Sequence, residues 1–332
     1  MPVNKNSHNS SGIFGTPAEP LFNNDENGSS AEILQDWLLN MAVVNTKEIK
    51  TSSSIQNIFT HGSWSECVFL MCDRFELPCQ AKYAALEIFD RFMLKHIQDL
   101  YEHVQNTKST KKKCDWECIL ERVKNQAFLR ILSCCQIASK LSSHYKVITV
   151  KRAKRCLLDA GYSYSCESIL QSEMRVLKTL SFNVSRTSCL DFIEILLEIL
   201  GHNTSGEKFD VKVYHETAVK ILTIICLHRH NIYDRLYLTT AGVAAGVLAS
   251  SEEQNTKLAA VKTDKMLLSA AVVATAVNMN DSSLTQEVII HLNKISEVPV
   301  EDIRDFMNVI IESIKQNISS LMNWRGTEQC KF

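Results

Sequence analysis

Glycine and proline are scarce in this sequence. Its 332 residues include only 10 glycines and 5 prolines, and four of the prolines stand at positions 2, 17, 20 and 299. Both residue types interrupt helices, so Pro78 is the one strong helix breaker deep in the chain. The hydrophobic share of 45% and the charged share of 22% are those of a folded globular protein. We therefore predict long, uninterrupted helices and an all-α fold.

A strong net charge and long apolar runs are also missing. The formal net charge is -1, which provides no sequence-wide attraction to nucleic acid or to an anionic membrane. We therefore predict neither as a direct partner. The longest apolar stretches, such as residues 266–277, are shorter than the roughly 18 residues of a membrane-spanning helix. The first residues have no apolar core of the kind that marks a secretory signal, so the expected location is inside the cell.

No catalytic or metal-binding pattern is found in the sequence. It has no glycine-rich phosphate loop, no His-Glu metal pair on a helix and no nucleophile elbow. The 12 cysteines are scattered through apolar segments, which favours reduced, buried thiols over a disulfide framework. Cys114 and Cys118 could share one helix face, but no Cys-x-x-Cys or histidine pair accompanies them. We predict neither an enzyme, nor a metal site, nor a bound cofactor.

Apolar residues recur at helical spacing from residue 31 onward. Residues 1–30 are rich in Asn, Ser and Gly and predict a disordered tail. A short amphipathic helix that starts at Ala31 is expected to pack on the first domain. Five helices of that domain are expected at about 54–76, 79–101, 116–143, 149–160 and 165–181.

A second set of helices repeats this rhythm. Its members are expected at about 189–200, 211–234, 238–252, 262–279, 284–296 and 300–319. Each half thus offers about five helices, and one nearly all-apolar helix, 131–141 or 267–277, would be the centre of its bundle. The predicted organisation is a first domain at 31–185, a second helical domain at 186–320 and a tail at 321–332.

Three short motifs in the first half resemble those of the cyclin family. Residues 86–93, in which Asp90-Arg91-Phe92 closes an apolar run, are similar to the second helix of a cyclin box. Residues 137–140 resemble the Ala-Ser-Lys that ends the third helix, and residues 173–182 resemble the fifth. Their order and spacing identify residues 54–185 as a cyclin box. The second half resembles a cyclin in the number of its helices and in their apolar pattern. The resemblance therefore implies a cyclin fold of two consecutive five-helix bundles.

The resemblance implies a binding site for a cyclin-dependent protein kinase at Lys140 and Glu173. In kinase-binding cyclins, a Lys and a Glu at the matching positions lie beside each other and hold a mobile helix of the kinase. We expect Lys140 and Glu173 to meet at exposed ends of their helices. The alternative is that Lys140 caps its own helix, where a cation suits the dipole, while Glu173 is a solvated surface residue. For Asp90 and Arg91 we favour an internal pairing that locks helix packing.

For two other groups of polar residues we favour an interpretation without a binding site. His228 and His230 lie near a predicted helix end, without the carboxylate or cysteine set that a metal site needs. Four cations crowd the start of another predicted helix, at Lys151, Arg152, Lys154 and Arg155. They are compatible with an acidic partner or a nuclear import signal, but a solvated helix face is the favoured interpretation.

Two stretches depart from the usual cyclin pattern. Leu141-Ser142-Ser143 stands where many cyclins have an aromatic residue and two glutamates, and residues 60–67 lack the usual docking patch for Arg-x-Leu motifs. The lysine-rich loop at 105–115 and residues 130–140 are most similar to a meiotic member of the family. That similarity implies crossover maturation during homologous recombination in the nucleus, with mismatch-repair-type and ubiquitin-ligase-type factors, and a cytoplasmic pool is also compatible with it. The sequence leaves two functions open, a cyclin-like kinase regulator and a kinase-independent scaffold for such factors. The near-neutral net charge argues against a third, a nucleic-acid reader built from two cyclin folds.

Overall fold

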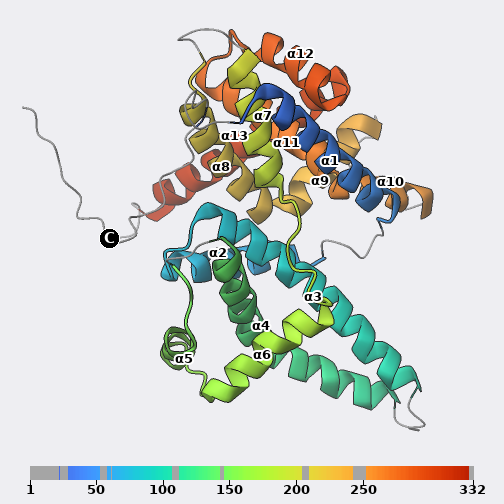
Figure 1. Cartoon of the computed structure of the whole chain (residues 1–332), viewed down its shortest axis with the longest axis vertical. Helices are drawn as coiled ribbons and strands as arrows, with labels where there is room; N and C mark the ends of the chain where they lie inside the picture. Colours follow the sequence, from blue (N-terminus) through green and yellow to red (C-terminus); the bar gives the residue numbers. More distant parts are fainter. Residues whose placement is uncertain are drawn as a thin grey trace, which may run out of the picture.

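Helices are the only regular secondary structure in the described part of the chain. The computed structural model describes residues 22, 29–52, 58–60, 62–106, 112–142, 146–203, 209–241 and 252–328, excepting the side chains of 58, 112–115, 241, 252–255 and 317–328. These residues form thirteen α-helices and one short 3-10 helix, and none of them lies in a strand. The all-α prediction is confirmed. Figure 1 shows two groups of helices, joined by the segment between α6 and α7.

The first group has the five predicted helices, although the one expected at 54–76 begins at Gly62 and follows a short 3-10 helix. They are α2 (Gly62–Arg74), α3 (Cys79–Asn106), α4 (Lys112–Ser142), α5 (Val150–Asp159) and α6 (Cys166–Thr179), preceded by the 3-10 helix η1 (Ile58–Thr60). Helix α4 is central, because it packs against α2, α3 and α6. Its segment from Ala127 to Ser139 is almost completely buried apart from Phe128, as its apolar sequence predicted.

The second group has more helices than the sequence predicted. They are α7 (Cys189–Asn203), α8 (Val211–Leu227), α9 (Arg229–Ala241), α10 (Glu252–Thr263), α11 (Lys265–Asn280), α12 (Thr285–Ser296) and α13 (Val300–Glu328). The central helix is α11, which packs against α7, α8, α12 and α13. Helix α13 continues past the predicted end at 319, so residues 321–328 are helical.

Two helix boundaries in the second group correct the prediction. The expected helix 211–234 is interrupted at His228, whose ψ of 23° ends α8 before α9 begins. The expected helix 262–279 is interrupted at Asp264, whose carboxylate accepts a hydrogen bond from the N–H of Leu267 at 3.0 Å and caps α11. Both interruptions last one residue, so they hardly disturb the apolar period. The expected helix 238–252 falls mostly on 242–251, which lie outside the described residues.

Helix α1 (Ala31–Lys50) packs on the second group and not, as predicted, on the first. Its neighbours are α7, α10, α11 and α12. It buries Leu34, Leu38 and Met41 there. Asn45 donates a hydrogen bond to the carboxylate of Asp264 at 2.8 Å and accepts one from the N–H of Lys265 at 3.0 Å. The periodicity of α1 predicted an apolar face correctly, but periodicity carries no information about which partner covers that face.

One residue of the predicted N-terminal tail packs on the helical body. The ring of Phe22 is half-buried and lies 5.0 Å from the ring of His215 in α8. The tail therefore contributes at least one apolar contact to the core. The prediction of disorder for residues 1–21 and 23–28 lies outside the described residues.

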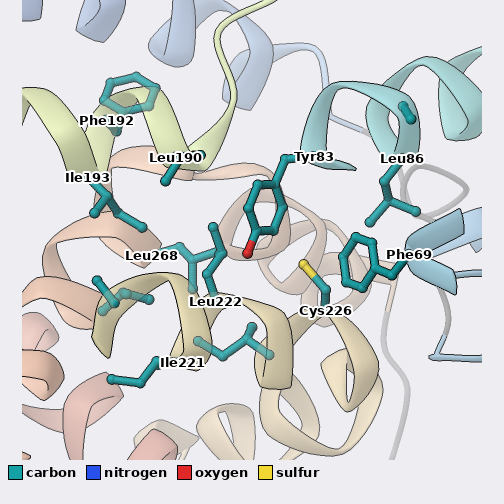
Figure 2. Close-up of a cluster of buried hydrophobic side chains, with 14 of the residues drawn as sticks. Phe69, Tyr83, Leu86, Leu190, Phe192, Ile193, Ile221, Leu222, Cys226 and Leu268 are labelled. Atoms are coloured by element: carbon teal, nitrogen blue, oxygen red, sulfur yellow. The ribbon is translucent and has the colours of Figure 1, made fainter. Parts of the chain in front are cut away.

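The two groups share one apolar core. Tyr83 of α3 projects into the second group, where its hydroxyl lies 3.0 Å from Oγ1 of Thr223 and 3.1 Å from the carbonyl oxygen of Val219 (Figure 2). Burial raises the pKa of Tyr83 far above its ordinary value. At Gly62, the start of α2 comes so close to α8 that an added methyl group would overlap the carbonyl oxygen of Leu227. The core is therefore continuous from α2 to α13.

Candidate partner-binding site

The predicted proximity of Lys140 and Glu173 is confirmed, since their side chains form an ion pair between α4 and α6. Lys140 lies in the last turn of α4, and its side chain is 47% exposed. Glu173 lies in the middle of α6 with a side chain only 8% exposed, so it is neither at a helix end nor solvated. Glu173 is therefore not at the helix end where we expected it, and it is not the solvated surface residue of the alternative interpretation either. The pair exposes a cation above a sheltered carboxylate.

A buried polar cluster, which includes the residue before Glu173, fixes α6 against α4. Arg130 donates hydrogen bonds to Oγ of Ser172 at 2.7 Å and to Oε1 of Gln126 at 2.8 Å. The hydroxyl of Ser133 also lies 2.7 Å from that of Ser172. Burial lowers the pKa of Arg130, although the guanidinium remains a cation at physiological pH. Because buried polar groups need partners with defined geometry, this cluster sets the register in which Glu173 faces Lys140.

Ser139, the middle residue of the Ala-Ser-Lys motif, holds the segment that enters α5. Its hydroxyl accepts a hydrogen bond from the backbone N–H of Ile148 at 3.0 Å and donates one to the carbonyl oxygen of Gln136 at 2.8 Å. The side-chain amide of Gln136 donates to the carbonyl oxygen of Ile148 at 3.4 Å. Both polar side chains are fully buried. The motif therefore fixes the end of α4 and leaves only Lys140 pointing outward.

Exposed apolar side chains surround the ion pair. Leu141 follows Lys140 and is 51% exposed, while Leu170 and Met174 lie within one turn of Glu173 and are 50% and 43% exposed. A cation with free hydrogen-bonding capacity, surrounded by apolar groups, is suited to bind the end of a partner helix. The arrangement is therefore suited to the recognition of a protein partner.

The Asp90-Arg91-Phe92 motif has the structural role that we favoured. A carboxylate oxygen of Asp90 accepts a hydrogen bond from the backbone N–H of Phe59 at 2.9 Å, which fastens η1 to α3. Arg91 donates to the carbonyl oxygens of Asn183 and Val184 at 3.0 and 2.9 Å. Phe92 is fully buried. The motif thus joins α3 to the segment before it and to the connection between the two halves.

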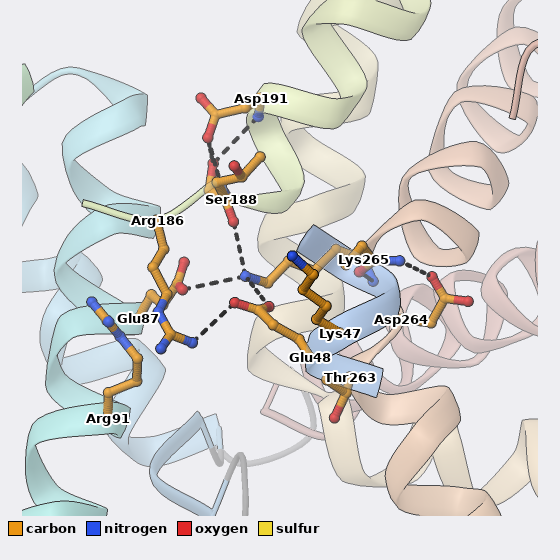
Figure 3. Close-up of polar contacts among 12 residues, drawn as sticks. Lys47, Glu48, Glu87, Arg91, Arg186, Ser188, Asp191, Thr263, Asp264 and Lys265 are labelled. Atoms are coloured by element: carbon orange, nitrogen blue, oxygen red, sulfur yellow. Dashed lines mark hydrogen bonds and ion pairs between the residues drawn. The ribbon is translucent and has the colours of Figure 1, made fainter. Parts of the chain in front are cut away.

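A charged cluster at the junction of the two halves was not predicted. Nζ of Lys265 lies 3.1 Å from a carboxylate oxygen of Glu48, 3.2 Å from one of Glu87 and 2.8 Å from the carbonyl oxygen of Thr187 (Figure 3). Arg186 pairs with Glu48 at 2.9 Å. Burial alone would lower the pKa of Lys265, but the two carboxylates outweigh it and raise that pKa. These residues come from four distant segments, so no local sequence signal could have revealed the cluster.

A cleft of about 580 Å³ opens beside this cluster, between α3 and the starts of α9 and α11. Its walls carry both signs of charge, including Asp90, Arg91, Glu87, Arg229 and Lys265. Arg229 donates a hydrogen bond to the carbonyl oxygen of Lys262 at 2.6 Å. The cleft therefore has no excess of one charge large enough to define a ligand.

The other polar residues singled out in the sequence form no site. His230 pairs with Asp234 at 3.2 Å, and His228 ends α8. Arg152 lies over the ring of Phe75 at 5.3 Å on α5. The ten cysteines with described side chains are free, including Cys118, while the side chain of Cys114 lies outside the described residues. Among the described residues, no cluster of His, Cys, Asp and Glu could hold a metal ion, and no helix is long and apolar enough to span a membrane.

Comparison with known proteins gives two relatives of similar length. The chain is 30% identical to mouse cyclin N-terminal domain-containing protein 1 over 285 residues, which cover 85% of this chain and 83% of the mouse protein. It is 28% identical to the human protein of that name over 284 residues, 85% of this chain and 84% of the human one. The chain belongs to this family. The cyclin-type fold predicted from the three motifs is thereby confirmed, whereas the extent of the cyclin box stays a prediction.

Two further comparisons concern solved structures and family models. A viral cyclin from herpesvirus saimiri superimposes with a TM-score of 0.49 at 13% sequence identity, covering 84% of this chain and 97% of the viral protein. No family model matches the chain. Family membership therefore rests on the match to the cyclin N-terminal domain-containing proteins, which spans both halves of the molecule.

Proposed function

We propose that this protein is a non-catalytic, cyclin-like regulator that binds a cyclin-dependent protein kinase through α4 and α6. The observation that carries the proposal is the Lys140–Glu173 ion pair, with a half-exposed cation and exposed apolar neighbours. A partner helix could bury Leu170 and Met174 while its terminal carbonyl groups accept hydrogen bonds from Lys140. The position of the pair on the third and fifth helices of the cyclin box supports a kinase as the partner.

The proposed cellular role is the promotion of crossover maturation during meiotic recombination in the nucleus. The similarity of the chain to cyclin N-terminal domain-containing protein 1 supports this role. Mismatch-repair-type and ubiquitin-ligase-type factors are the proposed further partners. The kinase would be brought to these factors by the cyclin-like protein, since binding modules commonly act by raising the local concentration of a partner.

Replacing Leu170 by Asp tests the kinase proposal without disturbing the buried polar cluster. We expect Leu170→Asp to weaken binding to purified cyclin-dependent kinases by about 2 kcal/mol, roughly 30-fold, because it places a charge in an apolar contact. Leu158→Asp is the matched control, because Leu158 of α5 is equally exposed, at 52% against 50% for Leu170. Calorimetric titration measures affinity, and thermal melts verify that both variants fold. Equal binding by the two variants would count against a kinase on this face.

A kinase-independent scaffold is the second candidate. It is supported by Leu141 and Ser142, which stand where many cyclins carry further kinase contacts. On this alternative, complexes with recombination factors persist in a Leu170→Asp variant and contain no kinase. Immunoprecipitation from meiotic tissue, probed for kinases and for mismatch-repair-type and ubiquitin-ligase-type proteins, distinguishes the two functions.

A further inference from the structure

Helix α1 carries an outward face that is unusually apolar. Five of its large hydrophobic side chains are between 47% and 60% exposed, namely Ile33, Trp37, Leu39, Val43 and Val44. No other helix has more than two such residues among the described side chains. Single exposed apolar residues are common on protein surfaces, but a contiguous group marks an interaction surface. The opposite face of α1 is already used, because it packs on α7 and α10.

The exposed residues form two neighbouring stripes along the helix. Ile33, Trp37, Asn40 and Val44 follow one another at spacings of four, three and four, so they lie on one line along α1. Glu32, Asp36, Leu39 and Val43 repeat the same spacing one position earlier, and Lys50 continues that line in the last turn. From the start of α1 to its end, the second stripe therefore has two acidic residues, then two apolar ones and finally a basic one.

Four of the five charged residues of α1 have no ion-pair partner among the described residues, the exception being Glu48. Glu32 and Asp36 lie in the first two turns, whereas Lys47 and Lys50 lie in the last, and all four are exposed. A partner helix that covers the apolar stripe should therefore be basic opposite Glu32 and acidic opposite Lys50. A second α1 that runs antiparallel to the first has that charge pattern.

We propose that two copies of this protein associate through their α1 helices, antiparallel about a two-fold axis level with Met41. In this register Glu32 of each copy faces Lys50 of the other, and Leu39 faces Val43. A parallel arrangement would instead place Glu32 against Glu32, which is unfavourable. Antiparallel packing also brings together helix ends of opposite dipole sign. The interface is isologous, as a two-fold dimer requires.

The α1 dimer leaves the candidate partner-binding site open. Helix α1 lies on the second group of helices, whereas Lys140 and Glu173 belong to the first group (Figure 1). A dimer would therefore present two copies of the α4–α6 surface. One 20-residue helix per copy, about 30 Å long, makes a small interface, so we expect a dissociation constant in the micromolar range.

Sedimentation of the full chain across a concentration series tests this proposal. We expect reversible dimerisation, which Leu39→Glu weakens about ten-fold or more. Leu70→Glu is the matched control, since Leu70 of α2 is 62% exposed, close to the 60% of Leu39, and should leave the dimer unchanged. Thermal melts show whether each variant is folded.

Charge reversal tests the antiparallel register. Glu32→Lys and Lys50→Glu should each weaken the dimer several-fold, and the double variant should restore it, because each reversed residue then faces a reversed partner. A protein that stays monomeric throughout the series overturns the proposal, whether the face is covered by another protein or by residues 1–21. Dimerisation that Leu39→Glu does not affect, or a double variant as weak as the single ones, overturns this interface.

Discussion

The central helices of the two halves, α4 and α11, are both deeply buried but bury different groups. The interior of α4 includes Arg130, Ser133, Gln136 and Ser139, all with hydrogen bonds to other side chains or to the backbone. The interior of α11 is apolar except for two hydroxyl groups. Ser269 donates to the carbonyl oxygen of Cys189 at 3.0 Å, and Thr275 donates to that of Ala271 within its own helix.

This difference places the buried polar groups in the half that carries the candidate site. Buried polar groups stabilise a protein less than apolar ones of the same size, unless all of them are satisfied. In the first half they lead from Arg130 through Ser172 to Glu173, and so position Glu173 beside Lys140. In the second half, small residues such as Ala270 and Ala274 let the neighbouring helices come close to α11. The second half thus provides packing area, including the surface on which α1 lies.

The largest expected effect concerns Lys265, the one charged residue of α11. Lys265→Met should destabilise the fold by about 3 kcal/mol, because Glu87 loses its ion-pair partner in a site where its side chain is only 20% exposed. Glu48 keeps Arg186. Chemical denaturation measures the loss, and adding Glu87→Gln should recover part of it. A change below about 1 kcal/mol would mean that the junction does not couple the two halves.

A pH titration tests the comparison further, because the first half contains a histidine whose pKa is lowered. Burial, together with Arg130 and Arg175, lowers the pKa of His96 from 6.5 to about 4. The unfolded chain therefore takes up this proton at higher pH, so stability is full above pH 6.5 and falls as the pH drops toward 4. For a half-buried group we expect a loss of about 1–2 kcal/mol after solvent screening.

His96→Leu isolates this contribution. The stability of the variant should depend less on pH between 6.5 and 4 than that of the wild type. The difference between the two stability curves is the contribution of His96 to the free energy of unfolding. Urea denaturation at a series of pH values provides both curves. Parallel curves would show that His96 has the same pKa in the folded and unfolded states.

A pair of hydroxyl deletions compares the two central helices directly. Ser133→Ala should cost about 1 kcal/mol, because the hydroxyl of Ser172 loses a partner 2.7 Å away in a closed site. Thr275→Val should change stability by less than about 0.5 kcal/mol, since its hydroxyl bonds only to a carbonyl of its own helix. Both residues are fully buried, so exposure does not differ between them. Equal losses in equilibrium denaturation would remove the proposed distinction between the halves.

The smallest expected effect should be the same in both halves. Glu76 and Glu297 have positive φ angles of 54° and 59°, a conformation that glycine adopts more readily. Replacing either by Gly should stabilise the protein by about 0.5 kcal/mol, because the strain is local and independent of the surrounding core. Melting temperatures of the two variants check this. A large difference between them would show that one of the two turns is held by contacts beyond its backbone.

The sequence predicted the features that depend on residues close together in the chain, and the cyclin resemblance added one contact between residues 33 positions apart. The five helices of the first half follow from the period of their apolar residues, and the meeting of Lys140 and Glu173 followed from the cyclin resemblance. Its failures have two causes. One-residue interruptions at His228 and Asp264 are too short to disturb an apolar period. The placement of α1 and the Lys265 cluster depend on contacts between distant segments, which no local pattern records.

The docking of α1 on the second half has a consequence for the order in which a new chain can fold. Asn45 and its partner Asp264 are 219 residues apart, so α1 leaves the ribosome long before its binding surface exists. At about 5–20 residues per second, the wait is roughly 10–40 seconds. During that time the α2–α6 bundle can fold, while both the inner and the outer apolar faces of α1 remain uncovered. Helix α1, the first of the described helices to be synthesised, is thus among the last to reach its native position, and nascent chains should depend on chaperones until α12 has emerged.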